Sequence, residues 1–494
     1  MVLARTVQGK VQGRIEDGIA VFRGIPFARP PVGPLRFAAP RPPEPWDGTR
    51  QALSFGPPPP QAGLPRSSDD WLTVNVWSPD PGGSGLPVMV FVYGGSYLRG
   101  TASNPMYDGA GLAAQGVVVV TFNHRVGAEG FAWVDGAPAD RGLLDQVAAL
   151  RWVRDNISAF GGDPDLVTVF GESAGAVGIA SLLVMESAAG LFRRAIVQSL
   201  SSIFHTPRLA RALAAELAAE AAKLPSEAGT PPAAPAVNPA GTDPGRPGET
   251  VLARFDPDRL VAAAGELAAR IPKEAVRWGP AVAATELPFA PVVDGEVLPR
   301  TPWEHPDPGV DLLVMHTRDE SRLWTVLSGP GRPGPESYAP HLAEQYRRSF
   351  PGVGDDLLHE IAESDWLFRM PAVHLAEAHA GRTFLAELCW SAAGGYGACH
   401  GLDIKLLFGA YAVGPGPAQF GERPSDEAVA LTAYMRKAWT SFAAGGDPGW
   451  PAYDADRRLT LRLDADPAVV PYPEEVSRRI WAGHRFQPLD LPSC

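Results

Sequence analysis

The sequence predicts an α/β fold built on a large, mostly parallel central sheet that is flanked by helices. Three continuous apolar stretches, at 88–92, 117–122 and 166–170, have the length and composition of strands that are buried on both faces. Between the second and third stretches, apolar residues recur at helical spacing, at Leu143, Val147, Leu150, Val153 and Ile157. Strands joined by helices in this order form a parallel sheet.

The third strand runs directly into Gly171-Glu172-Ser173-Ala174-Gly175, which fits the pattern G-x-S-x-G. A serine nucleophile on a strand-to-helix elbow needs glycines on both flanks, because the turn is too sharp for side chains there. An ordinary turn with a capping serine fits the same five residues. A serine hydroxyl is a weak nucleophile, so the catalytic interpretation also requires a histidine base, an acid that orients it, and N–H donors for an oxyanion.

The strand at 88–92 is followed by Tyr93-Gly94-Gly95-Ser96-Tyr97, which predicts a loop whose backbone N–H groups converge on a small anion. A plain glycine-rich turn is the alternative. A nucleotide-binding loop is disfavoured, since no G-x-G-x-x-G opens a helix here.

Candidates for the acid and the base follow two later strands, at 310–315 and 383–388. Asp319 and Glu320 both lie beyond the first of these, and residue chemistry alone does not separate them. Six histidines follow Glu320, but only His400 occupies a glycine-flanked loop after a strand. His400 is therefore the candidate base.

The composition is that of an acidic globular protein. The net charge of -12 opposes binding to nucleic acid. The 53 glycines and 52 prolines among 494 residues indicate many loops, yet they stay below the roughly 25–30% that signals disorder. No apolar run approaches the ~18 residues of a membrane span, and the first residues lack the apolar core of a signal peptide, so we expect no membrane partner and a cytoplasmic location.

Three cysteines, Cys389, Cys399 and Cys494, are scattered without the spacing of metal ligands. Their odd number also argues against a disulfide framework. We expect reduced thiols and no metal site.

The chain resembles the type-B carboxylesterases, the cholinesterase-like branch of the α/β-hydrolases. The resemblance is carried by FRGIPFA at 22–28, PPVG at 30–33, LRF at 35–37, DDWLTVNVW at 69–77, the elbow, and the stretches 142–164 and 438–453. It spans essentially the whole chain but is loose over 208–290. It implies one α/β-hydrolase domain over 1–494, with an antiparallel N-terminal portion and helical insertions over the active site. A segment rich in proline, glycine and alanine, at about 225–249, is expected to be mobile.

The resemblance also implies roles for individual residues. It assigns the nucleophile to Ser173, the acid to Glu320 and the base to His400. The oxyanion donors are assigned to Gly95, Ser96 and Ala174, and a buried network behind the triad to Glu172 and Ser199. It further implies two structural ion pairs, Arg36 with Asp69 and Arg125 with Asp145.

Together these features predict a serine carboxylesterase that acts on neutral short-to-medium acyl or aryl esters and needs no cofactor. Residues near the strand ends expected to line its substrate pocket are Tyr97, Phe204, Leu323, Trp324 and Phe368. An acyltransferase, or a pathway-specific hydrolase of an ester or carbamate, would share the same triad. A non-catalytic adhesion-type relative is disfavoured, since such proteins typically lose the serine. The expected partner is a small ester, and the sequence leaves open a monomer or a weak homo-oligomer.

Overall fold

The computed structural model describes residues 1–65, 67–225, 251–329 and 334–492. Within these ranges, 13 strands form one sheet in the order β1-β2-β3-β5-β7-β6-β8-β9-β10-β11-β12-β13, and β4 pairs with β2. The strands are β1 (Val2–Arg5), β2 (Lys10–Glu16), β3 (Ile19–Pro26), β4 (Thr49–Gln51), β5 (Thr73–Ser78), β6 (Leu86–Val92), β7 (Val118–Phe122), β8 (Gly162–Glu172), β9 (Arg194–Gln198), β10 (Asp311–Thr317), β11 (Thr383–Leu388), β12 (Leu459–Leu463) and β13 (Ala468–Pro471).

The middle of the sheet is parallel and its N-terminal portion is antiparallel. The pairs from β7 through β6, β8, β9, β10 and β11 to β12 are all parallel. The chain reaches this region through antiparallel pairs among β1, β2, β3, β5 and β7. This arrangement confirms the predicted α/β-hydrolase architecture with an antiparallel N-terminal portion.

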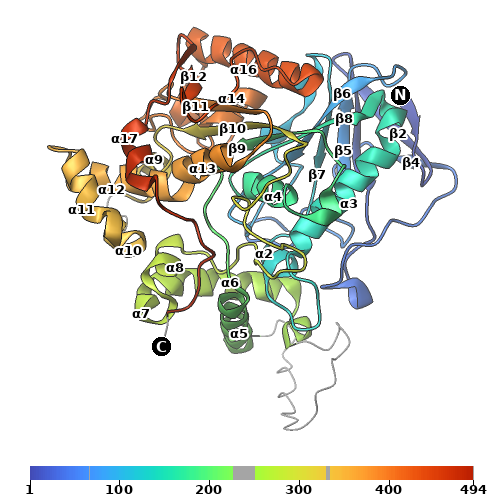
Figure 1. Ribbon diagram of the computed structural model, residues 1–494. Helices are drawn as coiled ribbons and strands as arrows, with labels where there is room; N and C mark the ends of the chain where they lie inside the picture. The colour runs from blue at the N-terminus through green and yellow to red at the C-terminus, as the bar shows by residue number, and fades with distance from the viewer. Residues whose placement is uncertain (66, 226–250, 330–333, 493–494) are drawn as a thin grey trace.

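Helices cover both faces of the sheet, with α3 and α4 on one side and α14 and α16 on the other (Figure 1). The helices are α1 (Ala110–Ala113), α2 (Gly127–Phe131), α3 (Arg141–Asn156), α4 (Ala174–Leu182), α5 (Pro207–Lys223), α6 (Pro257–Arg270), α7 (Ala275–Trp278), α8 (Pro280–Thr285), α9 (Arg322–Ser328), α10 (Pro335–Tyr338), α11 (Pro340–Ser349), α12 (Asp355–Ser364), α13 (Met370–Ala378), α14 (Leu402–Phe408), α15 (Gly416–Phe420), α16 (Asp426–Gly445) and α17 (Glu475–Trp481). None of them is long and apolar enough to cross a membrane.

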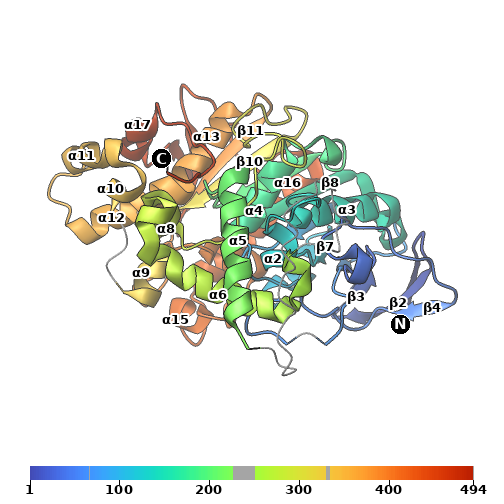
Figure 2. The same cartoon turned by 90° about the horizontal axis from the view of Figure 1, so that it is seen from below.

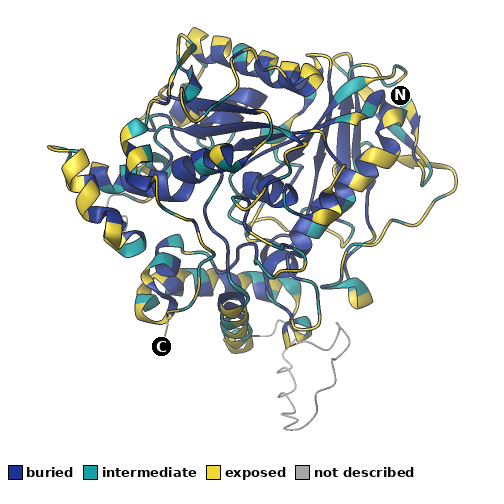
Figure 3. Cartoon of the chain, in the orientation of Figure 1, coloured by how far each residue is buried: buried dark blue, intermediate teal, exposed yellow. Residues whose placement is uncertain are grey.

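The central strands divide their side chains between two hydrophobic cores. On β6, Val88, Val90 and Val92 pack in the core that includes α3 and α4. The intervening Met89 and Phe91 pack in the core that includes α14 and α16. Because both faces are buried, the strand reads as an unbroken apolar run rather than an alternating one. Figure 3 shows the consequence, with the central strands buried and the outer sides of the helices exposed.

Helices α5 to α8 form an insertion between β9 and β10 and lie together beneath the sheet in Figure 1. Figure 2 shows α5 and α6 side by side from below. Thr206 caps α5 by accepting a hydrogen bond from the amide of Leu209 at 3.2 Å, and Pro207 occupies the first turn. The many alanines of α5 also favour a helix. The segment expected to be mobile, at 225–249, lies outside the described residues apart from Pro225.

A fully buried ion pair joins the loop after β7 to α3. The guanidinium of Arg125 donates to both carboxylate oxygens of Asp145 at 2.8 Å, and both side chains have no exposed surface. The same carboxylate accepts the backbone N–H of Arg125 at 2.9 Å. This pair was predicted correctly.

The other expected pair is different in the structure. Arg36 pairs with Glu129 on α2, at 2.7 Å, and not with Asp69. It also donates to the carbonyl oxygens of Ala253 and Phe255. Arg36 therefore ties the N-terminal portion to α2 and to the segment that leads into α6.

We predict that Asp145→Ala lowers the free energy of unfolding by roughly 3–5 kcal/mol, since it leaves the charge of Arg125 buried without a counter-ion. Chemical denaturation followed by tryptophan fluorescence would measure the change. Asp155→Ala is the matched control, because the Arg154–Asp155 contact is about half exposed on both sides and should contribute less than ~1 kcal/mol. Equal midpoints for the two variants would contradict the prediction.

Candidate active site

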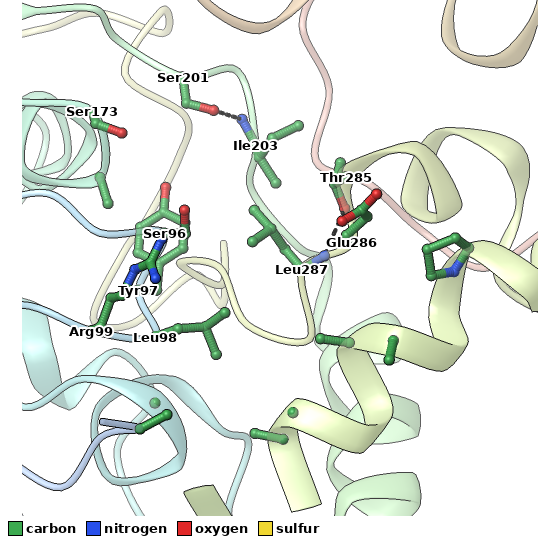
Figure 4. A pocket seen from close by; sticks show the side chains of 18 of the residues that line it. Ser96, Tyr97, Leu98, Arg99, Ser173, Ser201, Ile203, Thr285, Glu286 and Leu287 are labelled. Carbon is green, nitrogen blue, oxygen red and sulfur yellow. Dashed lines mark hydrogen bonds between the residues drawn. The ribbon is translucent and has the colours of Figure 1, made fainter. Parts of the chain in front are cut away.

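Ser173 alone forms the turn between β8 and α4. Its backbone has φ 58° and ψ −127°, a conformation that is strained for a residue with a side chain. A Cβ atom on Gly171 would lie 2.5 Å from the carbonyl oxygen of Val92, and one on Gly175 would lie 2.1 Å from the same atom. Both flanks therefore require glycine, as the sequence pattern predicted. Figure 4 shows the Ser173 hydroxyl on one wall of a cavity.

The glycine-rich loop after β6 packs directly against this elbow. A Cβ on Gly94 would lie 2.9 Å from the Cβ of Ser173. Gly95 has φ 124° and Ser96 has φ 58°. The backbone N–H groups of Gly95, Ser96 and Ala174 donate to no other group in the described part of the chain. These amides are therefore free to bind an anion beside Ser173.

Glu320 is a completely buried carboxylate that three donors surround. Its Oε1 accepts from the Ser199 hydroxyl at 2.7 Å and from the amide of Thr317 at 2.8 Å. Its Oε2 lies 2.6 Å from Nδ1 of His400. Burial alone would raise the pKa of this carboxyl, but the charge of His400 and the hydrogen bonds lower it below its usual range.

Asp319, the alternative acid, has different partners. Its carboxylate pairs with Arg318 at 2.8 Å and accepts the backbone N–H of Ala398 at 2.9 Å. It thereby connects the loops after β10 and β11. Of the two neighbouring acids, Glu320 is the one whose carboxylate reaches the imidazole of His400.

His400 lies between two carboxylates. While Nδ1 faces Glu320, Nε2 lies 2.9 Å from Oε1 of Glu172. No hydrogen bond joins His400 to the Ser173 hydroxyl among the described residues. Burial opposes protonation of the imidazole, but the charges of Glu172 and Glu320 outweigh it and raise the pKa of His400 to about 10. The two carboxylates thus favour the imidazolium form of this histidine in the free protein.

Two aromatic rings cover the imidazole of His400. The ring centroid of Phe368 lies 4.4 Å from that of His400, and the centroid of Trp324 lies 5.1 Å from it. Phe368 comes from a single π-helical turn, Asp365–Arg369, that joins α12 to α13. A widened turn of this kind often marks a functional site. Here it brings an aromatic side chain onto the candidate base.

The cavity in front of Ser173 has a volume of about 600 Å³. Ser96, Tyr97 and Ser173 lie along one wall in Figure 4, and Ile203, Thr285 and Leu287 lie opposite them. The charged residues that line it are all exposed: Arg99, Lys273 and Glu286. The buried part of the lining is therefore uncharged and largely apolar.

Three of the five residues expected in a substrate pocket line this cavity, namely Tyr97, Trp324 and Phe368. The structure places the other two elsewhere. Phe204 is completely buried, with its ring packed edge-on against Trp303 at 5.6 Å. Leu323 packs against the core on the α14 and α16 side of the sheet. Being near a strand end therefore did not suffice to place a residue in the cavity.

Sequence reasoning missed the wall that α6 contributes. Its residues share a small side chain and helical spacing, at Val261, Ala264, Gly265, Ala268 and Ala269. This stripe was readable in the sequence as one face of a helix, but only the folded chain shows what it faces. Thr285, which ends α8, and Leu287, which follows it, were also not anticipated.

A second layer of buried polar groups lies behind the site. Gln198, at the end of β9, donates to Oδ2 of Asp403 at 2.5 Å and accepts from the indole of Trp439 at 3.1 Å. Burial, with the nearby charges of Glu172 and Glu320, raises the pKa of Asp403 to about 7. Burial also raises the pKa of the thiol of Cys399, the residue before His400, to about 12.

The two cysteines in the described ranges are free thiols. Cys389 and Cys399 are buried and not disulfide-bonded, and Cys494 lies outside the described residues. No group of three or more histidine, cysteine, aspartate or glutamate side chains in the described ranges could hold a metal ion.

Comparison with known proteins places these features in context. The model of the carboxylesterase family matches residues 2–350. The para-nitrobenzyl esterase of Bacillus subtilis (strain 168) is 36% identical, over 97% of this chain and 98% of its own length. The fumonisin B1 esterase of Sphingopyxis macrogoltabida is 34% identical, over 92% and 85%. A solved PNB esterase structure superposes with a TM-score of 0.82 at 35% identity, covering 97% of this chain and 99% of that one.

We predict that Glu172→Gln lowers the pKa of His400 by roughly one unit or more, because it removes one of the two negative charges that stabilise the imidazolium. NMR titration of histidine-labelled protein, assigned with His400→Asn, would measure it. Glu186→Gln, which removes an exposed carboxylate, should leave the titration unchanged. A titration of His400 that is the same with and without the Glu172 carboxylate would show that the contact does not set this pKa.

Proposed function

Since this chain belongs to the carboxylesterase family and is a carboxylic ester hydrolase, we propose that it cleaves neutral esters through an acyl-enzyme formed on Ser173. One observation carries the proposal: a serine on a strained elbow faces a cavity whose buried lining is uncharged, beside three unengaged amides and a histidine–glutamate pair. We propose Ser173, His400 and Glu320 as the catalytic triad and the amides of Gly95, Ser96 and Ala174 as the oxyanion hole.

In the proposed reaction, Oγ of Ser173 attacks the ester carbonyl while Nε2 of His400 accepts its proton. The carbonyl oxygen becomes an oxyanion that the three amides bind, each contributing on the order of 3 kcal/mol. Collapse of the tetrahedral intermediate breaks the ester C–O bond, and His400 returns the proton to the departing alcohol. Water then attacks the acyl-enzyme by the same steps and releases the acid. Glu320 keeps the proton of His400 on Nδ1 and stabilises the imidazolium.

In this scheme, the contact between His400 and Glu172 is present in the free protein and is not the arrangement that reacts. Catalytic hydrogen bonds are often long or absent until substrate binds. To act as a base, His400 has to lose its proton and direct Nε2 toward Ser173, which is the neighbour of Glu172 in the chain. Glu172 therefore competes with Ser173 for the imidazole and favours its inactive, protonated form.

The cavity supports the substrate class. Its small and apolar lining near Ser173 suits short-to-medium acyl groups or aryl groups. A charged substituent there would lose its hydration, and the buried charges of His400, Glu172 and Glu320 already pair with one another. The two relatives named above are esterases with different substrates in their names, so family membership alone does not select one. The proposal therefore rests on the shape and charge of the cavity.

We predict that Ser173→Ala lowers kcat for p-nitrophenyl esters by about four orders of magnitude or more, because the nucleophile is removed. A fluorophosphonate should label the wild-type protein at Ser173, as located by peptide mass spectrometry, and should not label the variant. Ser158→Ala, at an exposed serine, is the control and should keep full activity and labelling. Folded wild-type protein that is neither labelled nor active on any ester would overturn the proposed function.

We also predict that kcat/KM rises with pH along an acid limb, and that the midpoint of this limb lies above the ordinary histidine pKa of about 6.5. The raised pKa of His400, about 10, means that the neutral base becomes abundant only in alkaline solution. Glu172→Gln should move this limb to lower pH and so increase the fraction of full activity seen at neutral pH. A wild-type limb at or below the ordinary histidine value would contradict the prediction.

A further inference from the structure

The Tyr97 hydroxyl is a buried polar group that the proposed mechanism does not use. Tyr97 is 4% exposed, and its hydroxyl has no hydrogen-bond partner in the described part of the chain. The residue lines the cavity in front of Ser173. Figure 4 shows it beside Ser96, on the same wall as Ser173. Tyr97, on the wall that carries the nucleophile, therefore holds a buried donor that has no partner among the described residues.

The backbone and the packing hold this side chain in place. Tyr97 has φ 61°, a left-handed conformation that is rare for an aromatic residue. Its carbonyl accepts the amide of Gly127 at 2.6 Å, and Leu98 closes the turn by donating to the carbonyl of Gly95 at 3.1 Å. The ring packs edge-on against Phe131, with 5.3 Å between the centroids. The hydroxyl is thus positioned before any ligand arrives, which lowers the entropic cost of using it.

The chemistry of the hydroxyl limits what it can bind. Burial raises its pKa far above the ordinary tyrosine value, so it stays a neutral phenol that can donate a hydrogen bond. A buried donor without a partner is costly, and an acceptor supplied by a ligand removes that cost. The charged side chains that line the cavity are exposed. The buried imidazolium of His400 is already paired with Glu172 and Glu320, so neither would compensate an anion beside Tyr97. An uncharged oxygen acceptor is therefore the ligand group that fits.

We propose that Tyr97 is a specificity-determining residue whose hydroxyl donates a hydrogen bond to an uncharged oxygen, such as an ether or keto oxygen, close to the scissile ester. This inference rests on the proposed function and narrows its substrates to esters of oxygen-bearing acids or alcohols. Because the donor is fixed, a substrate with methylene in place of that oxygen leaves the hydroxyl unsatisfied and is selected against.

The test compares isosteric substrates that differ by one oxygen. For the acyl side, p-nitrophenyl methoxyacetate is paired with p-nitrophenyl butanoate. For the alcohol side, 2-methoxyethyl butanoate is paired with butyl butanoate, with acid release followed by pH-stat. The measured quantity is the ratio of kcat/KM within each pair, and intrinsic reactivity cancels when the ratio for Tyr97→Phe is divided by that for wild type. We expect Tyr97→Phe to lower the ratio for at least one pair about three- to tenfold.

Tyr411→Phe is the matched control, since it removes a tyrosine hydroxyl that donates to Thr432 at 2.6 Å and does not line the cavity. It should leave both ratios unchanged. The melting temperature of Tyr97→Phe should be equal to or above that of wild type, because the lost hydroxyl had no protein partner. Ratios within twofold of wild type for both pairs, with ester hydrolysis intact, would overturn the inference alone. Wild-type protein that hydrolyses none of the four esters would overturn the proposed function and the inference together.

Discussion

A buried negative charge sets the arrangement of this site. Glu320 has no exposed surface, so its charge is tolerable only where donors replace the water it has lost. Those donors come from three neighbouring parts of the sheet: Ser199 follows β9, Thr317 ends β10, and His400 lies on the loop after β11. The parallel order of the three strands places their carboxyl ends at one edge. The carboxylate of Glu320 therefore joins the ends of β9 and β10 to the loop that carries His400. This contact orients the imidazole.

Much of this could be predicted from the sequence, because the relevant signals are local. Gly171 and Gly175 flank Ser173 for a steric reason that five residues suffice to express, and the unbroken apolar run of β6 reports burial on both faces. The choice of Glu320 over Asp319 came from the family resemblance and not from local chemistry. Both are acids after the same strand, and only the fold separates the one that meets His400 from the one that meets Arg318.

What escaped prediction depends on contacts between distant segments. Arg36 was expected to pair with Asp69, yet Glu129 on α2 is the carboxylate that the folded chain brings to it. Glu172 was expected behind the triad, and its carboxylate instead contacts Nε2 of His400 directly. Phe204 illustrates the limit in another way, since its aromatic character suits a pocket wall and a core equally well. In each case the residue type was informative, but the partner was set by packing.

The small-residue face of α6 sets the size of the cavity, whereas the residues at the cavity floor, beside Ser173, set its chemistry. The floor is formed where β6 and β8 end, and there Gly171 and Gly175 are crowded by a backbone carbonyl and admit no side chain. Helix α6 belongs instead to the connection between β9 and β10, and a methyl group added to its inner face takes up cavity space without touching the sheet. Single substitutions on this one helix can therefore change the size of the ester that fits, without altering the residues around Ser173.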